Sequence, residues 1–306
     1  MTLAATYPIG TPGVPWGESE RQRWREAQVR QRSYVEQVEQ RIEALADRYD
    51  VIEYGQLDYA PDRYRLLALR SRPWVDELPV VLVTGGVHGY ETSGITGALA
   101  FAEGAALDQA GRANVLIAPC VSPWAFERIH RWNAEAVDPN RSFRTPSPAA
   151  ESAALMALVA PYRGRFLLHV DLHETTDTDE SEFRPALAAR DGKPYEPGEI
   201  PDGFYTVGDS NNPQLDFQKA VIAGVQRVTH IAPADAQGQI IGSPVVAPGV
   251  ILYPFAELGL CAGVTDARYT TTTEVYPDSP WVTADRCKAA QVAAVRAALA
   301  YALAAG

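Results

Sequence analysis

The chain has 306 residues, 46% of them hydrophobic and 21% charged, with a formal net charge of −11, which argues against a general nucleic-acid binder because neutralising phosphates requires clustered Lys and Arg. Three well-separated cysteines without a CxxC pair argue against a disulfide framework or a cysteine-based zinc site, so we expect three reduced, buried thiols. No secretory signal and no apolar run of membrane-spanning length is apparent, which predicts no membrane contact and a cytoplasmic location.

The N-terminal sixth of the chain predicts a lead-in and a helix. Residues 1–16 carry Pro and Gly at turn-forming positions and are expected to be irregular. Residues 17–48 predict an amphipathic helix, because Val35, Val38, Ile42 and Leu45 recur at three- and four-residue steps. Two candidate strands follow, 51–59 and 64–72, of which the second mixes apolar and basic residues and favours an edge or half-buried position.

Continuous apolar runs then predict strands that are buried on both faces, at 78–89, 113–119 and 165–173. Helices are expected between them at 92–102 and 151–162. This alternation predicts an α/β fold with a mixed, mostly parallel central sheet and helices on both faces. The stretch 180–250 gives only helical cues at 213–228, and a β-branched strand at 269–277 and an Ala-rich helix at 284–304 close the chain. One domain over 1–306 is the simplest interpretation, with residues 50–304 forming the core after the 1–48 segment.

The first candidate site motif lies at the end of the predicted strand PVVLVTGG. His88 and Glu91 are three residues apart where the chain turns into a helix, so both can reach one ion. Zinc favours imidazole nitrogen and carboxylate oxygen, and open α/β sheets bind ligands at the carboxyl ends of their strands. An HxxE pair taken alone is common by chance.

A second motif ends another predicted buried strand, RFLLHVDLH. His173 offers a third ligand at the same edge of the sheet, and Asp171 shares its strand face and can orient the imidazole. His169 shares this face deeper in the strand, where we expect a core histidine. His130 and His230 lack partner motifs, and structural roles are expected for both, with His130 near the pocket rim at most.

Two further features supply charged groups. In RWNAEAVDPNRSF, Arg141 offers a planar fork for a substrate carboxylate, and Arg131 can stabilise an oxyanion, although a solvated Arg paired with Asp138 is the simpler alternative. In YTTTTEVYP, Glu274 can take a proton from a water and deliver it to a leaving amine.

In this order the motifs GGVHGYE, RWN with DPNRSF, DLHETT and YTTTTE resemble the zinc metallocarboxypeptidase family, of which carboxypeptidase A is the best-known member. The resemblance spans roughly residues 50–300 and implies a carboxypeptidase A-like (phosphorylase/hydrolase-like) fold. It implies that His88, Glu91 and His173 bind one zinc ion and that Asp138 orients His88.

The resemblance also implies roles toward a substrate, which would be a small peptide or an N-acyl amino acid with a free carboxylate. Asn140 and Arg141 would bind that carboxylate, Arg131 would polarise the scissile carbonyl, and Glu274 would be the general base and acid. A mobile Tyr of the family corresponds to Tyr253 here. Tyr269 is nearer to Glu274 in sequence, but its odd offset puts it on the opposite strand face.

DPNRSF and DLHETT are also similar to the aspartoacylase and succinylglutamate desuccinylase branch, whose members cut N-acyl amino acids. In that branch the catalytic Glu comes sooner after the third ligand and a further β domain follows. Glu274 comes late and is followed by one helix, so we expect a carboxypeptidase ahead of an N-acyl amino acid amidohydrolase, with a non-catalytic binding protein as a third alternative.

The stretch from Asp171 to Glu182 contains six acidic residues and no Lys or Arg. A solvated, mobile loop is the simpler interpretation. The alternative is a negative rim that favours a cationic substrate end such as Lys or Arg.

Overall fold

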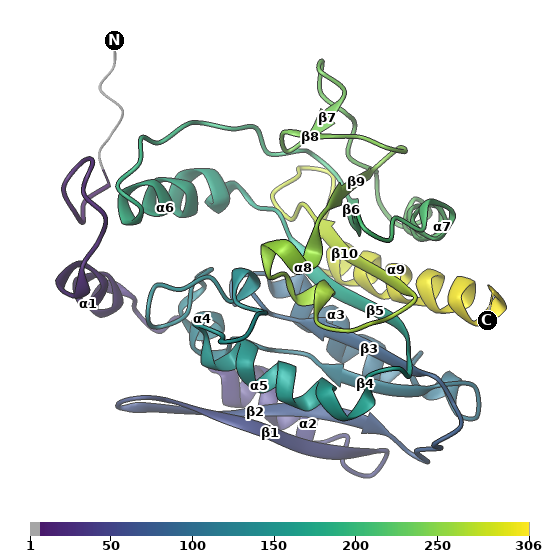
Figure 1. The fold of residues 1–306 in the computed structure, drawn as a ribbon. Coiled ribbons are helices and arrows are strands. Elements are labelled where there is room, and N and C mark those ends of the chain that lie inside the picture. Colours follow the sequence, from purple (N-terminus) through teal and green to yellow (C-terminus); the bar gives the residue numbers. More distant parts are fainter. Residues whose placement is uncertain (1–6, 306) are drawn as a thin grey trace.

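The structure, a computed structural model, describes residues 7–305, so the first six residues of the predicted lead-in and Gly306 lie outside it. Eight strands form the central sheet in the order β1-β2-β4-β3-β5-β10-β6-β9 (Figure 1). Their bounds are β1 Tyr49–Tyr59, β2 Asp62–Ser71, β3 Val80–Gly85, β4 Asn114–Ala118, β5 Phe166–Glu174, β6 Tyr205–Asp209, β9 Val250–Tyr253 and β10 Tyr269–Val275, and a separate ribbon pairs β7 (Gln239–Ile240) with β8 (Ser243–Pro244).

The middle of the sheet is parallel, and antiparallel pairs flank it on both sides. β4, β3, β5 and β10 run parallel to one another, and β9 runs parallel to β6. The β1–β2 hairpin, the β2–β4 pair and the β10–β6 pair are antiparallel. The predicted mixed, mostly parallel sheet is therefore confirmed, and the parallel strands bring their carboxyl ends to one edge.

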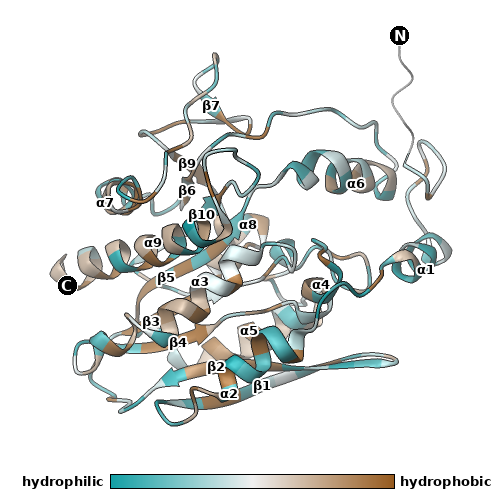
Figure 2. Cartoon of the chain, turned by 180° about the vertical axis from the view of Figure 1, so that it is seen from behind, coloured by the Kyte–Doolittle hydropathy of each residue, from teal (hydrophilic) through white to brown (hydrophobic). Residues whose placement is uncertain are grey.

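Helices cover both faces of this sheet, as predicted. Their bounds are α1 Glu18–Ala27, α2 Gln40–Glu43, α3 Thr92–Glu103, α4 Pro123–Arg128, α5 Ala150–Val159, α6 Arg184–Arg190, α7 Leu215–Val225, α8 Phe255–Leu258 and α9 Ala284–Ala305. The largest apolar cluster joins α3, α7 and α9 to one face, and a second cluster joins α5 to the other. The central strands β3 and β4 are accordingly hydrophobic along their length (Figure 2).

The predicted helix over 17–48 is wrong as a single element. α1 ends at Ala27, and a π-helical segment, Val35–Glu39, begins only after an irregular stretch. In that stretch the backbone amides of Gln31 and Arg32 both donate to the carbonyl of Glu127, at 2.7 and 3.2 Å. These contacts with a segment far along the chain replace the helical hydrogen bonds that the apolar spacing predicted.

The expected edge or half-buried position of the second strand is also wrong. β2 lies between β1 and β4, and Leu66, Leu67, Ala68 and Leu69 are fully buried. Its arginines lie near the strand ends, where Arg70 binds Asp50 at 2.7 Å.

The stretch 180–250, which the sequence left largely unassigned, contributes to both the sheet and the wall of a cavity. It contains α6, β6, α7 and the β7–β8 ribbon, and β9 begins at its end. Across residues 7–305, none of the helices combines the length and apolar character that crossing a membrane requires. All three cysteines are unpaired thiols that are buried, as expected.

Candidate metal centre and active site

Three side chains with metal-binding chemistry meet at the carboxyl edge of β3 and β5. One nitrogen or oxygen atom from each of His88, Glu91 and His173 lies within 4.8 Å of the others. Nδ1 of His88 lies 2.7 Å from Oε1 of Glu91, and Nδ1 of His173 lies 2.7 Å from Oε2. Each of the three side chains is at most 2% exposed, so the group is almost completely shielded from solvent.

The turn that carries His88 and Glu91 depends on close backbone packing. A side-chain carbon on Gly89 would lie 2.0 Å from the backbone nitrogen of Phe126 in α4, so only glycine fits there. Gly86 turns the chain with a φ of +59° directly after β3. α3 begins at Thr92, directly after Glu91, so the carboxylate is fixed at the start of a helix.

Both imidazoles are held from behind by carboxylates. Nε2 of His88 lies 3.0 Å from Asp138, and Nε2 of His173 lies 2.7 Å from Asp171. Burial alone would lower the pKa of His173, but Asp171 and Glu91 hold it well above its usual value. Burial would raise the pKa of Glu91, but His173 and His88 lower it to about 2. Each imidazole thus presents Nδ1 inward, an arrangement common among metal-binding histidines.

This donor set fits a divalent ion. Oε2 of Glu91 is buried and forms no hydrogen bond of good geometry among the described residues, although Nδ1 of His173 lies 2.7 Å away. A buried carboxylate oxygen without a well-formed hydrogen bond is costly, and a bound cation would satisfy it. Two imidazole nitrogens and a carboxylate form a three-ligand set that zinc enzymes use.

A second group of potential ligands, His169, Asp171 and Cys261, lies deeper in the same region. Its members converge on the hydroxyl of Thr84, at 3.0 Å from His169, 2.6 Å from Asp171 and 3.6 Å from Cys261. Burial lowers the pKa of His169 to about 4, which favours the neutral imidazole. The hydrogen bonds satisfy this group internally, in keeping with a core histidine.

Glu274 stands beside the His–Glu–His group on the neighbouring strand. Its Oε2 accepts a hydrogen bond of 2.9 Å from Thr175, whose hydroxyl lies 2.7 Å from that of Tyr205. Oε1 has no hydrogen-bond partner among residues 7–305, and the side chain lines a cavity of about 260 Å³. Burial raises the pKa of Glu274 to about 8.

Arg131 enters the same cavity from the segment before the Pro139–Arg141 turn. Its Nε donates to Asp138 at 3.1 Å, and its Nη1 contacts the Tyr90 hydroxyl at 3.2 Å and Asp179 at 3.4 Å. The pairing of Arg131 with Asp138 that the sequence suggested is therefore present, but in a buried setting instead of a solvated loop.

Arg141 differs from Arg131 in having no carboxylate of residues 7–305 within 4.0 Å. It is exposed, and its guanidinium donates to the carbonyl of Asn140 at 2.7 Å. The Asn140 side chain lines the cavity; its Oδ1 accepts from the backbone of Cys261 at 2.7 Å, and its Nδ2 lies 3.5 Å from Nε2 of His173. Tyr253 also lines the cavity, whereas Tyr269 packs against Phe217 on the opposite side of the sheet.

Residues 77–192 match the sequence profile described as the succinylglutamate desuccinylase/aspartoacylase catalytic domain. No curated protein matches the chain in sequence.

Solved structures resemble the chain over most of its length. A protein described as a candidate metallopeptidase from Shewanella amazonensis is 21% identical, with 88% of this chain and 91% of that chain covered and a TM-score of 0.62. Carboxypeptidase A from Helicoverpa armigera is 16% identical, with coverage of 90% and 74% and a TM-score of 0.59. A metallo-carboxypeptidase from Pseudomonas aeruginosa in complex with (2-guanidinoethylmercapto)succinic acid is 17% identical, with coverage of 88% and 69% and a TM-score of 0.57.

This chain has a carboxypeptidase A-like fold, and its residues 77–192 are similar in sequence to the succinylglutamate desuccinylase/aspartoacylase catalytic domain.

Within this carboxypeptidase A-like fold, sequence reasoning missed three residues around the cavity. Thr175 donates to Glu274, Tyr205 contacts the hydroxyl of Thr175, and Asp179 contacts Arg131. Thr175 directly follows the DLHE motif and could have been suspected. Tyr205 lies in the unassigned stretch, and no local pattern indicated it.

The acidic stretch forms neither a solvated loop nor a negative rim. Asp171 and Asp179 are buried, and Glu174 is buried with its carboxylate accepting from the backbone of Ser93 at the start of α3. Glu180 is half-buried and binds Arg184. Only Asp177 and Glu182 are exposed, so this arrangement does not favour the alternative of an exposed negative rim that attracts a cationic substrate end.

The remaining histidines, His130 and His230, make contacts that fit the structural roles expected for them. His130 packs against Trp24 with ring centroids 4.8 Å apart and is not part of the cavity wall. His230 lies 2.8 Å from Asp202 at the half-buried surface, a partner that the sequence did not indicate.

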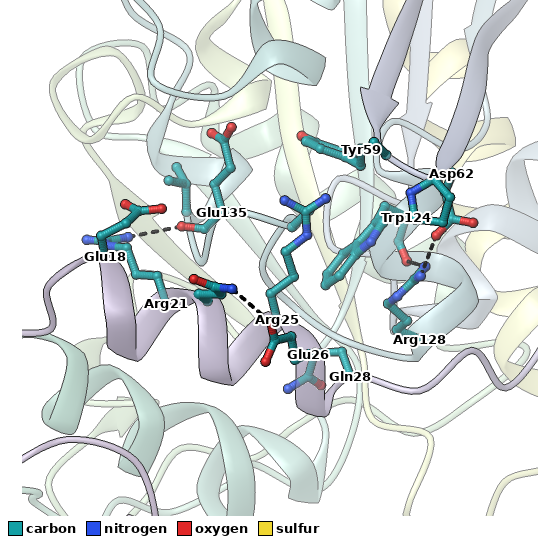
Figure 3. A pocket seen from close by; sticks show the side chains of 15 residues that line it. Glu18, Arg21, Arg25, Glu26, Gln28, Tyr59, Asp62, Trp124, Arg128 and Glu135 are labelled. Atoms are coloured by element: carbon teal, nitrogen blue, oxygen red, sulfur yellow. Dashed lines mark hydrogen bonds and ion pairs between the residues drawn. The ribbon is translucent and has the colours of Figure 1, made fainter.

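A larger cavity of about 780 Å³ lies apart from this site, between α1, the tip of the β1–β2 hairpin and α4 (Figure 3). Its lining includes no histidine or cysteine. Arg128 pairs with Asp62 at 2.7 Å, and Arg25 lies 5.7 Å from the ring centre of Tyr59. Its size alone therefore does not make it the reactive site.

Proposed function

We propose that this chain is a zinc-dependent metallocarboxypeptidase, which hydrolyses the C-terminal amide bond of a peptide or peptide-like substrate. One observation carries the proposal. His88 of the buried His88–Glu91–His173 group, a carboxylate with a free oxygen on Glu274 and an unpaired guanidinium on Arg141 all line one cavity. These are the groups that peptide hydrolysis at a free C-terminus requires.

The chain's own residues would divide the chemistry as follows. A zinc ion held by the His–Glu–His group would supply Lewis-acid polarisation and a water of lowered pKa. Oε1 of Glu274 would accept the proton of the attacking water and return it to the leaving amine. Arg131 would donate to the carbonyl oxygen as negative charge develops there. Arg141, with the amide of Asn140 and the hydroxyl of Tyr253, would bind the terminal carboxylate.

The cavity favours one terminal residue with an uncharged side chain. About 260 Å³ lies below the range of about 300–1,000 Å³ that is usual for drug-sized ligands. Besides the charged groups, its lining contains nine uncharged side chains, among them Phe183, Val207, Ile241, Tyr253 and Leu260. Of its arginines, Arg184 is paired with Glu180 and Arg131 with two aspartates, so Arg141 alone is free for a carboxylate.

A second candidate is an N-acyl amino acid amidohydrolase, which the match of residues 77–192 to the desuccinylase/aspartoacylase profile favours. That match includes all three proposed ligands but ends well before Glu274. The single free arginine supports one substrate carboxylate, which argues against a substrate with several carboxylates such as N-succinylglutamate, which has three. The succinic acid derivative bound to the Pseudomonas aeruginosa enzyme shows that a carboxylate ligand suits a related fold.

The test is a substrate panel on the zinc-loaded protein. N-blocked dipeptides ending in Leu, Lys and Glu would be compared with N-acetyl and N-succinyl amino acids. We expect the Leu substrate to be cleaved fastest. Arg141→Gln should raise KM for it by about 10–100-fold, as expected for a lost hydrogen bond to a charged group. The matched control is Arg144→Gln, since Arg144 is exposed and has no carboxylate within 4.0 Å among residues 7–305.

Each outcome is informative. Turnover of N-acyl amino acids alone would select the second candidate, and no turnover of any substrate by zinc-loaded protein would reject a hydrolase. An unchanged KM in Arg141→Gln would reject this arginine as the carboxylate anchor.

A further inference from the structure

Asp179, one of three buried acidic residues in the stretch, faces the cavity from the π-helical turn Asp179–Phe183. Its Oδ1 accepts a hydrogen bond of 2.6 Å from the hydroxyl of Tyr90 and lies 3.4 Å from Nη1 of Arg131. Its Oδ2 accepts from the backbone nitrogen of Thr176 at 2.8 Å. The side chain is 8% exposed, so these contacts are shielded from solvent.

The same turn holds Arg131 a second time through Phe183. The guanidinium carbon lies 4.2 Å from the centre of the Phe183 ring, a cation–π contact. Asp138 accepts from Nε on the other side of the guanidinium. Nε and Nη1 are therefore occupied, whereas Nη2 makes no hydrogen bond to any group of residues 7–305, and Arg131 lines the cavity.

A guanidinium fixed along two edges and one face has little freedom to rotate. Its remaining donor, Nη2, is thereby aimed without the entropic cost that a long side chain usually pays when it is ordered. Tyr90 lies between His88 and Glu91, so its hydroxyl links Asp179 to the turn that carries two proposed metal ligands. The position of Arg131 is in this way tied to that of the metal centre.

We infer that Asp179 is a positioning residue, which acts through Arg131 by holding the guanidinium so that Nη2 meets the scissile carbonyl oxygen in the transition state. The inference rests on the proposed hydrolase function. This role differs from attraction of the substrate, because the carboxylate of Asp179 contacts Arg131 inside the protein instead of facing solvent.

A structural role for Asp179, in which it merely neutralises a buried arginine, predicts a different kinetic pattern. Loss of positioning lowers kcat and leaves KM nearly unchanged, since the contact is made in the transition state. Loss of charge balance lowers folding stability and leaves the kinetics of the folded fraction unaltered.

The experiment compares Asp179→Asn with Glu182→Gln, an exposed carboxylate on the same turn that has no ion pair among the described residues. Removing one oxyanion donor costs about 10²–10³ in kcat, so misplacing it should cost about 10–100-fold. We expect this loss in Asp179→Asn with KM within about threefold. Glu182→Gln should match the wild type. Zinc content and thermal midpoint are measured for every variant.

A double-mutant cycle with Arg131→Ala tests the route of action. If Asp179 acts through Arg131, adding Asp179→Asn to Arg131→Ala should change kcat by less than about twofold. Tyr90→Phe provides a second variant in case Asp179→Asn does not fold, and it should also lower kcat selectively, because it frees Asp179 from the metal-ligand turn.

An unchanged kcat in an active, folded Asp179→Asn or Tyr90→Phe protein, a loss confined to KM, or additive effects in the cycle would overturn the inference and leave the proposed function standing. A wild-type protein that cleaves nothing would instead reject the function and this role together.

Discussion

Glu274 is the direct neighbour of His173 in the parallel register between β10 and β5. Because paired residues of adjacent strands project to the same face, the carboxylate and the imidazole are placed side by side by backbone hydrogen bonds. No loop lies between them. A general base held by paired strands stays at a fixed distance from the metal centre, and no mobile segment is needed to place it.

Removing the acidic function of Glu274 should abolish most turnover without emptying the metal centre. We expect Glu274→Gln to lower kcat by about 10²–10⁴-fold, the range typical for a lost general base. Zinc content, measured by atomic emission, should equal that of the wild type, because Glu274 is not among the converging ligands. A binding protein without catalytic function would show no turnover to lose.

The hydroxyl of Thr175 should matter for the same reason, since it fixes Oε2 of Glu274. We expect Thr175→Val, which keeps the shape but removes the donor, to lower kcat by about tenfold, near the value of one hydrogen bond. Thr175→Ser keeps the donor and serves as the matched control. Equal rates for the two variants would show that the hydroxyl does not orient the base.

The two candidate metal groups can be separated by their histidines. We expect His173→Ala to lose bound zinc, because it removes one of three ligands, and His169→Ala to retain one equivalent, because His169 is bonded to Thr84 instead. The readout is zinc per chain after dialysis against a weak chelator. Retention of zinc by His173→Ala together with its loss from His169→Ala would instead assign the metal site to the deeper group of His169, Asp171 and Cys261.

Much of this arrangement was predictable because its determinants are local. The apolar runs that end in His88 and His173 are long enough to indicate buried strands, and parallel buried strands bring their carboxyl ends together. The alternate-face rule likewise separated Tyr253 from Tyr269, which the structure places on opposite sides of the sheet.

What escaped prediction depends on contacts between distant segments. The break after α1 arises where Arg32 and its neighbours bind α4 and the turn at Gly89, and nothing in residues 17–48 encodes those acceptors. β6 and β9 have five and four residues, too few to show a period. The inward orientation of Asp179 follows from Arg131 and Tyr90, which lie more than forty residues earlier in the chain.

Arg32 ties the N-terminal segment to the turn that carries the proposed ligands. Its guanidinium donates to the carbonyls of Phe126 at 2.7 Å and Gly89 at 2.8 Å and to the hydroxyl of Thr92 at 2.8 Å. It also lies 3.7 Å from the centre of the Phe126 ring. Burial lowers the pKa of Arg32 to about 10, which leaves it charged at neutral pH.

We expect Arg32→Ala to lower the free energy of unfolding by about 1–3 kcal/mol, because it leaves buried carbonyls without a donor. Arg32→Lys should recover only part of this, since an ammonium group cannot reach three acceptors in the planar geometry of a guanidinium. Urea titration gives the stability, and Arg23→Ala, which removes an exposed residue paired only with Glu20, is the control. Equal midpoints for Arg32→Ala and Arg23→Ala would contradict the predicted role.

Glu151 gives the protein a pH-dependent stability outside the proposed site. Its side chain is 1% exposed, and Oε2 accepts hydrogen bonds of 3.3 Å from the Tyr59 hydroxyl and the Asn133 amide. Burial raises its pKa from the ordinary 4.5 to about 7. Between these values the folded chain holds a proton that the unfolded chain releases, so the contribution of Glu151 to stability is full below pH 4.5 and is lost as the pH rises through 7.

Glu151→Gln should remove this dependence, because a neutral amide resembles the protonated carboxyl in shape and charge. The stability difference between variant and wild type is expected to grow in favour of the variant from pH 4.5 to 7 by about 3 kcal/mol in total, and to stay constant above that range. Urea titrations at half-unit pH steps measure it, with the exposed Glu36→Gln as control. Taking differences at each pH cancels the other titrating carboxyls, so a flat difference would mean that Glu151 is ionised in the folded protein throughout, stabilised by Tyr59 and Asn133 more than burial opposes it.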